Sequence, residues 1–231
     1  SLVISAFTCT HDAATVGTAL HELMPANVPL AGMTTCRGVV CNGQWSTHRK
    51  EYALSVWALS DEEGGEFAVV HIPERGDDFQ EVVRRKLTEA SGLRRAQPSF
   101  ALLLGSPGAE EQTLESIGMA LGEGVPVLGG SSADNKVQGE WRQISKQGST
   151  CFGVEEPAMS ENGVVVVVAW CTCEVSTTMT SGFYQTECKG NVTKVSEDRR
   201  TVLEIDGKPA GEVYDGWTEG ALTKGLEYDA E

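Results

Sequence analysis

Apolar positions recur along the chain with two different periods, one typical of helices and one typical of strands. Two sets share one helical face each, and each set predicts an amphipathic helix. These sets are Val16, Leu20 and Leu23, and Leu114, Ile117 and Leu121. A third helix is expected from Asp77 to Ala90. Asp77 or Asp78 can cap its start, and Gly92 can stop it.

Two stretches repeat the same order of elements. Ser1–Thr35 and Ser99–Ser132 each read as an apolar strand, a polar turn, an amphipathic helix, a Val-Pro pair and a second strand. Glu66–Ile72 falls opposite Gly163–Ala169 at the same offset as the two Val-Pro pairs. The period is about a hundred residues, which is too long for a solenoid. We therefore expect two α/β halves related by duplication.

A pair of strands is expected after each of these units. The side chains of Glu51–Ser60 alternate in the manner of a strand, and Glu66–Ile72 is a mainly apolar second strand. Because a turn lies between these two strands, we expect them to pair as a hairpin. Arg142–Gly153 and Gly163–Cys173 are expected to pair in the same way. The predicted fold class is α/β, with duplicated halves of a β-α-β unit plus a β-hairpin, and mixed sheets with helices packed on them.

The rest of the chain holds shorter elements. Asn191–Val195 and Thr201–Ile205 read as strands, and Pro209 can start a helix. Thr218–Glu231 has few apolar anchors and is expected to fray. We predict a first α/β half at 1–92, a second half with the main motifs at 93–218, and a tail at 219–231 leading toward a missing C-terminal domain.

The charge and composition of the chain limit the classes of partner that it can be expected to bind. The 231 residues include 18 Lys and Arg against 33 Asp and Glu, so the net charge is −15. This field repels phosphate backbones and anionic lipid, and we expect neither nucleic acid nor membrane as a partner. No apolar run approaches the roughly 20 residues of a membrane span. Seven cysteines without a repeating framework indicate reduced thiols and a cytoplasmic protein.

The stretch Val125–Asn135, read VPVLGGSSADN, is the best candidate for a binding site. A buried strand that ends in Gly-Gly leads into small polar residues, and α/β sheets bind ligands just past the carboxyl ends of their strands. Backbone, hydroxyl and carboxylate groups here suit a small ligand with an amine or hydroxyls. The alternative is a tight turn in which Asp134 and Asn135 bond their own backbone.

Three residues outside this stretch complete the candidate site. Ser106 and Gly108 lie where the preceding strand of the same half ends, just before a predicted helix. Trp141 could form one wall of a pocket, or it could simply cover the core. The predicted ligand-binding residues are Gly129, Gly130, Ser131, Ser132, Asp134, Asn135, Trp141, Ser106 and Gly108.

Five motifs follow one another along the chain: SPG-x-EE at 106–111, GGSSADN at 129–135, WRQ at 141–143, EIDGKPA at 204–210 and YDGWT at 214–218. In this order they resemble the FIST family, the sensory domain of F-box and intracellular signal transduction proteins. The resemblance implies an N-terminal FIST domain that binds a small ligand, with amino acids as candidates. It also implies attached signalling or F-box modules, and some bacterial members are similar to haem-binding gas sensors.

Metal and haem chemistry find little support in the sequence. Cys171 and Cys173 would share one strand face, but two ligands do not make a zinc site, and Cys36 and Cys41 would have to join them. All four histidines lie in the first 71 residues, without a C-x-x-C-H motif. We expect no metal and no cofactor, with haem kept only as an alternative that the family implies.

The predicted function is an intracellular sensory and signal-transduction domain that binds a small polar ligand at the strand-exit loops. One alternative is a protein-interaction scaffold of an F-box-type protein, and another is a haem-based gas sensor. We do not expect an enzyme, because G-x-S-x-G is absent. A cysteine-dependent hydrolase, with Cys36 as nucleophile and His48 as base, is the remaining alternative.

Overall fold

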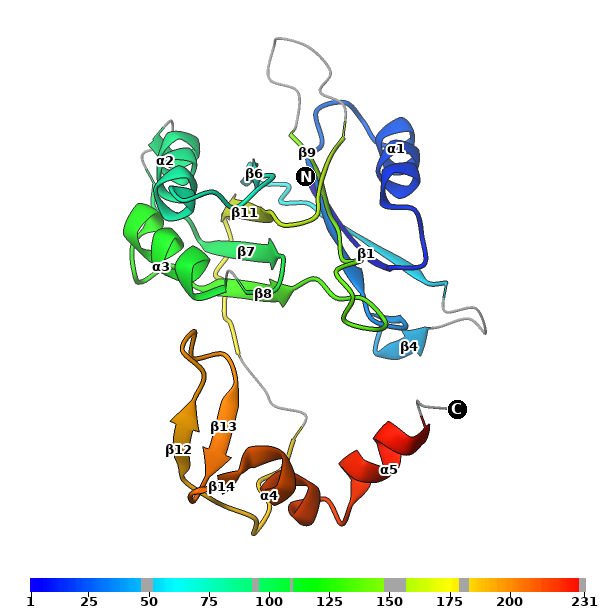
Figure 1. Ribbon diagram of the computed structural model, residues 1–231. Helices are drawn as coiled ribbons and strands as arrows, with labels where there is room; N and C mark the ends of the chain where they lie inside the picture. The colour runs from blue at the N-terminus through cyan, green and yellow to red at the C-terminus, as the bar shows by residue number, and fades with distance from the viewer. Residues whose placement is uncertain (47–51, 93–95, 109, 148–156, 179–182, 229–231) are drawn as a thin grey trace. The chain divides into compact units, whose positions relative to one another are not determined.

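The computed structural model describes residues 1–46, 52–92, 96–108, 110–147, 157–178 and 183–228. By spatial contact the chain divides into two compact units, Ser1–Thr177 and Thr178–Glu231. Figure 1 shows the elements of both. Each unit is described on its own.

The first sheet of the larger unit has five strands in the order β10-β9-β2-β1-β5. Its centre is a β-α-β unit in which β1 and β2 run parallel and α1 connects them. The elements are β1 (Leu2–Thr8), α1 (Ala13–Leu23), β2 (Leu30–Thr35), β5 (Leu54–Leu59), β9 (Gln143–Lys146) and β10 (Ala158–Ser160). A short hairpin between β2 and β5 consists of β3 (Val39–Cys41) and β4 (Gln44–Ser46).

The second sheet has four strands in the order β6-β11-β7-β8. It contains another β-α-β unit, with β7 and β8 parallel and α3 between them, and β11 runs antiparallel to both β7 and β6. The elements are β6 (Glu66–Ile72), α2 (Phe79–Gly92), β7 (Phe100–Gly105), α3 (Glu110–Leu121), β8 (Val127–Ser131) and β11 (Val164–Trp170).

The two sheets pack face to face, with helices on both outer faces (Figure 1). α1 covers the outer face of the first sheet, and α2 and α3 cover the outer face of the second. The side chains between the sheets include Leu2, Ala31, Val69, Leu104, Val165 and Val167. The larger unit is therefore a four-layer sandwich of helix, sheet, sheet and helices.

The central strand of the second sheet explains this layering. All seven residues of β11 are buried, including five consecutive valines, Val164–Val168. Because successive side chains of a strand point to opposite faces, such a strand needs apolar neighbours on both sides. Val166 and Val168 face α2 and α3, whereas Val165 and Val167 face the first sheet.

The predicted hairpins are wrong. β5 pairs with β1 in the first sheet, and β6 pairs with β11 in the second, so the two strands do not pair with each other. The link between them crosses from one sheet to the other, and the Asp61 carboxylate accepts hydrogen bonds from Thr172 as well as from the Glu63 N–H of its own turn. β9 and β11 likewise lie in different sheets.

The mixed α/β fold class is confirmed, and all three predicted helices of the larger unit are present. Each sheet holds a β-α-β unit, but the duplication of whole halves is not confirmed. Both sheets draw strands from either side of the boundary predicted at residues 92 and 93.

The smaller unit holds a three-stranded antiparallel sheet and two helices. Its elements are β12 (Val192–Val195), β13 (Val202–Ile205), β14 (Lys208–Pro209), α4 (Ala210–Trp217) and α5 (Ala221–Tyr228). The tail that we expected to fray contains α5. The Asp215 carboxylate accepts hydrogen bonds from the backbone N–H groups of Leu222 and Thr223, which caps the first turn of that helix.

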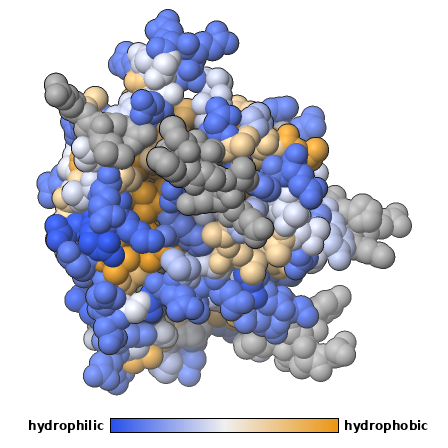
Figure 2. Space-filling model, turned by 90° about the horizontal axis from the view of Figure 1, so that it is seen from above, coloured by the Kyte–Doolittle hydropathy of each residue, from blue (hydrophilic) through white to orange (hydrophobic). Residues whose placement is uncertain are grey.

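Hydrophilic side chains dominate the face seen in Figure 2, where hydrophobic surface forms separate patches. This is in keeping with the net charge of −15. Among the described residues, no helix is both long enough and apolar enough to cross a membrane.

Candidate functional site

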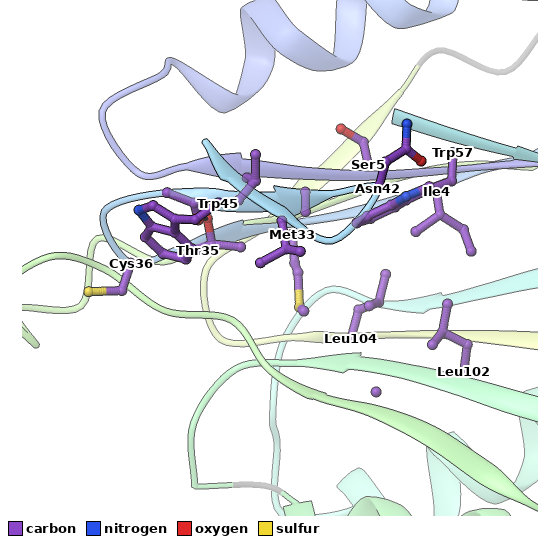
Figure 3. A pocket seen from close by; sticks show the side chains of 15 residues that line it. Ile4, Ser5, Met33, Thr35, Cys36, Asn42, Trp45, Trp57, Leu102 and Leu104 are labelled. Atoms are coloured by element: carbon purple, nitrogen blue, oxygen red, sulfur yellow. Dashed lines mark hydrogen bonds between the residues drawn. The ribbon is translucent and has the colours of Figure 1, made fainter. Parts of the chain in front are cut away.

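A cavity of about 720 Å³ lies between the two sheets of the larger unit (Figure 3). Its walls come from both sheets, with Ile4 and Met33 on one side and Leu102 and Leu104 on the other. We call it the inter-sheet cavity. Its lining residues are Ile4, Ser5, Ala6, Met33, Thr35, Cys36, Gly38, Val39, Val40, Asn42, Trp45, Trp57, Leu102, Leu104 and Gly129.

Strand register places these apolar side chains. Ile4 of β1 lies opposite Trp57 of β5, and residues directly opposite each other in a sheet share a face. Ala6 lies beside Met33 of β2 in the parallel pair, so it shares that face as well. The cavity therefore depends on long-range pairing that no single stretch of sequence reveals.

Polar residues of the cavity lining lie at the end of β2 and in the β3–β4 hairpin. Thr35 and Cys36 lie at one end of the cavity near the indole ring of Trp45, and Asn42 lies apart from them, near Ser5 and Trp57 (Figure 3). Thr35 Oγ1 donates a hydrogen bond to the Gly38 carbonyl at 2.8 Å, which fixes the start of the hairpin. We call this region the polar rim.

The predicted strand-exit stretch meets the cavity at Gly129. This residue has φ +110°, and an added Cβ would collide with the Leu103 backbone, so only glycine fits. Gly130 follows it, and the space where its side chain would lie is open. Of the nine predicted site residues, Gly129 is the one that lines the cavity.

Ser131 and Gly108 share one partner, the Glu110 carboxylate at the start of α3. Ser131 Oγ donates to Glu110 Oε1 at 2.6 Å, and the Gly108 N–H donates to Glu110 Oε2 at 2.8 Å. The carboxylate thus joins the two strand exits of the second sheet beside a helix N-terminus, where negative charge is favourable.

Ser132 belongs to a buried chain of hydrogen bonds that links the two sheets. Its Oγ donates to the Gly105 carbonyl at 2.9 Å and bonds to the Gln143 side-chain amide at 2.6 Å. That amide bonds in turn to Ser160 Oγ at 2.9 Å, which lies 2.9 Å from His71 Nε2. Buried polar groups need such partners, because an unpaired one costs about 1–3 kcal/mol.

Asp134 organises the loop that follows. Its carboxylate accepts hydrogen bonds from the backbone N–H groups of Lys136, Val137, Gln138 and Glu140. Burial raises the pKa of Asp134, but the four hydrogen bonds outweigh it and hold the pKa below its usual value. The tight turn that we considered as an alternative is therefore present at Asp134.

Asn135 connects this loop to the polar rim. Its Oδ1 accepts a hydrogen bond from the Arg37 N–H at 2.7 Å, and the Ala133 N–H donates to the Thr34 carbonyl at 3.0 Å. The strand exits of β2 and β8 are thereby joined side by side.

The two remaining predicted residues lie apart from the cavity lining. Trp141 is half-buried in the segment before β9, and Ser106 is fully buried. The Ser106 hydroxyl makes no hydrogen bond to any described residue.

Two cysteines lie near the polar rim. Cys36 is exposed, and Cys9 follows the end of β1, where its N–H donates to the Thr35 carbonyl. Burial is the main cause that raises the pKa of the Cys9 thiol, with Asp134, Glu140 and Cys36 adding to it. The predicted base for Cys36, His48, lies outside the described residues.

A haem would need an axial ligand in the cavity. The lining offers two sulfur ligands, Cys36 and Met33, whereas none of the described histidines belongs to it. These two residues are therefore the ones that could hold a haem iron there.

A family model described as the FIST N domain matches residues 1–208. The chain belongs to the FIST N domain family. The match covers the whole larger unit, including the first ninety residues, where the motifs are weaker. Membership is consistent with a sensory domain of signal transduction. Searches of curated proteins and of solved structures found no match.

The sequence motifs point to polar groups, and they do not identify the apolar side chains that line the cavity. The alternation of apolar residues in β1 and β5 was visible, but it does not tell which face meets a second sheet.

The Asp134 loop gives a first test. Asp134→Ala leaves four backbone N–H groups without their acceptor, and we expect it to lower the free energy of unfolding of this FIST domain by about 1–3 kcal/mol. Asp134→Asn keeps one acceptor oxygen and should cost less. Urea denaturation measures both, and equal stability of Asp134→Ala and the wild type would contradict this role.

The buried chain predicts a pH dependence. Burial, and then the charge of Lys86, lower the pKa of His71 from 6.5 to about 4. Between these pH values the unfolded chain binds a proton at His71 that the folded chain does not. Stability from this group is therefore complete above pH 6.5 and falls by up to about 3 kcal/mol as pH drops to 4.

The matched variant is His71→Gln, which removes the titrating group but keeps a side-chain donor. Subtracting its unfolding free energy from that of the wild type at each pH isolates the His71 contribution. Parallel curves from pH 7 to pH 4 would contradict the assignment.

Proposed function

We propose that Ser1–Thr177 is a sensory domain whose ligand binds in the inter-sheet cavity. The observation that supports this proposal is a cavity of about 720 Å³ with a mainly apolar lining and few polar groups. Ligand sites in proteins typically measure 300–1,000 Å³ and have this composition.

The lining favours a small, largely apolar ligand with one polar end. Leucine, isoleucine and methionine side chains would contact the apolar part, and the indole of Trp57 offers a flat face. Thr35 of the polar rim would hydrogen-bond to the polar end. An amino acid with an apolar side chain satisfies both requirements, so we still predict that the ligand is an amino acid.

The strand-exit stretch has a supporting role in this proposal. Its hydroxyl and carboxylate groups are hydrogen-bonded within the protein, through Glu110, Gly105 and the Asp134 loop. Gly129 brings the backbone of β8 to the cavity wall. The stretch would shape the site, while the apolar strands supply the contact area.

Signalling would follow from the position of the cavity between two layers. A ligand that touches both sheets favours the arrangement in which they enclose it, and this shifts the population of conformations. The Arg37–Asn135 hydrogen bond joins the polar rim to the β8 exit, so both would respond together. Attached signalling modules would read this change.

A haem-based gas sensor is the second candidate, and the observation that favours it is the presence of Cys36 and Met33 in the cavity lining. When bound, haem would supply a site for a diatomic gas. Cys36, at the exposed rim, and Met33, between the sheets, would hold its iron through sulfur.

The test combines an absorbance spectrum of the purified protein with a thermal-shift screen against the amino acids. A compound that binds only the folded state raises the melting temperature with concentration. Ala6→Phe places a large ring in the cavity, and we expect it to weaken binding of any hit at least about tenfold. Leu23→Phe adds the same ring at an exposed position and should bind as the wild type does.

A Soret band that disappears in Cys36→Ser or Met33→Leu would select the haem candidate. Undiminished binding in Ala6→Phe would contradict the cavity site. A colourless protein that no compound stabilises would favour a protein-interaction scaffold, for which β5 offers exposed apolar side chains such as Leu54 and Val56.

A further inference from the structure

A second group of reactive side chains lies where the β5–β6 link meets the end of β11. One carboxylate oxygen of Asp61 and the sulfurs of Cys171 and Cys173 all lie within 4.8 Å of one another. No other group of three or more such ligands gathers in the part of the chain that the structure describes. None of the three lines the inter-sheet cavity.

The fold holds these groups in place from both sides. The Thr172 N–H donates to Asp61 Oδ2 at 2.7 Å, and Thr172 Oγ1 donates to Asp61 Oδ1 at 2.6 Å. The Cys171 N–H donates to Ser99 Oγ at 2.8 Å, which anchors the backbone of the Cys-x-Cys segment. Oδ1 also accepts a hydrogen bond from the Glu63 N–H at 3.1 Å, so both of its lone pairs are used, and Oδ2, which accepts from the Thr172 N–H, is the oxygen that would ligate a cation.

We propose that Asp61, Cys171 and Cys173 form a three-ligand site for zinc. Two thiolates select a thiophilic ion such as Zn²⁺ over Mg²⁺ or Ca²⁺, and a carboxylate is a common third ligand. With Zn–S bonds of about 2.3 Å, tetrahedral coordination separates the two sulfurs by about 3.8 Å. The ligand atoms are already within 4.8 Å, so small side-chain rotations complete the geometry.

The fourth coordination position faces a second cavity. All three ligands line a space of about 480 Å³, together with Glu62 and Glu63. A water molecule fits this position, as it does in zinc sites with three protein ligands. Zinc here would tie the link between the two sheets to the end of β11, and it would stabilise the folded state by binding to it.

The sequence pointed to only part of this set. Cys171 and Cys173 lie just after β11 rather than on one strand face, and Cys36 does not belong to the group. The third ligand comes from Asp61, 110 residues before Cys171, and only the fold brings it there.

The experiment uses the full chain, reduced and freed of metal by a chelator, and titrates it with Co²⁺ and Zn²⁺. We expect one equivalent of Co²⁺ to give the thiolate charge-transfer and visible bands of a tetrahedral site, and one equivalent of Zn²⁺ to abolish them. Zinc should also raise the melting temperature.

Single substitutions test which residues ligate the metal ion. Cys173 is exposed, so Cys173→Ser should fold normally, lose the charge-transfer intensity of one thiolate and bind at least about tenfold more weakly. Asp61→Asn should weaken binding by a similar factor. Cys188→Ser removes an exposed thiol of the smaller unit and should change nothing. Absence of the bands in reduced wild type, or bands of undiminished intensity in Cys173→Ser, would overturn the proposal.

Discussion

The burial of β11 is the constraint on which the other layers of this FIST domain depend. Its neighbours β6 and β7 satisfy its backbone on both edges, while its valines point alternately to both faces. One face is covered by α2 and α3, and the other can be covered only by the first sheet. Burying each valine side chain contributes about 1.5 kcal/mol or more, so the two sheets are held together strongly.

The inter-sheet cavity is a consequence of this packing. Large side chains fill the contact where Leu2, Val165 and Val167 meet, whereas small residues, Ala6 and Gly129, face the space nearer to the polar rim. The polar residues of the strand-exit loops fasten the same region from outside, through Glu110 and the Asp134 loop. Apolar contact area and polar anchoring are thus supplied by different parts of the chain.

Local features were predictable from the sequence, and long-range pairing was not. The helix expected from Asp77 to Ala90 is present as α2, which spans Phe79–Gly92, because its apolar stripe lies within one segment. The predicted hairpin of β5 and β6 was wrong, because each strand pairs instead with a partner 47 residues or more away in the sequence. Gly129 was found from its motif, but Trp57 reaches the cavity through its register with Ile4.

The most direct test of an apolar cavity between the sheets needs no knowledge of the ligand. Xenon enters dry apolar cavities. In a protein labelled with ¹³C at its methionine methyl groups, xenon pressure should shift the Met33 resonance in a saturable way, since Met33 lines the cavity. The Met119 resonance, from a residue that is 66% exposed on α3, should stay in place. An unmoved Met33 resonance would contradict the account.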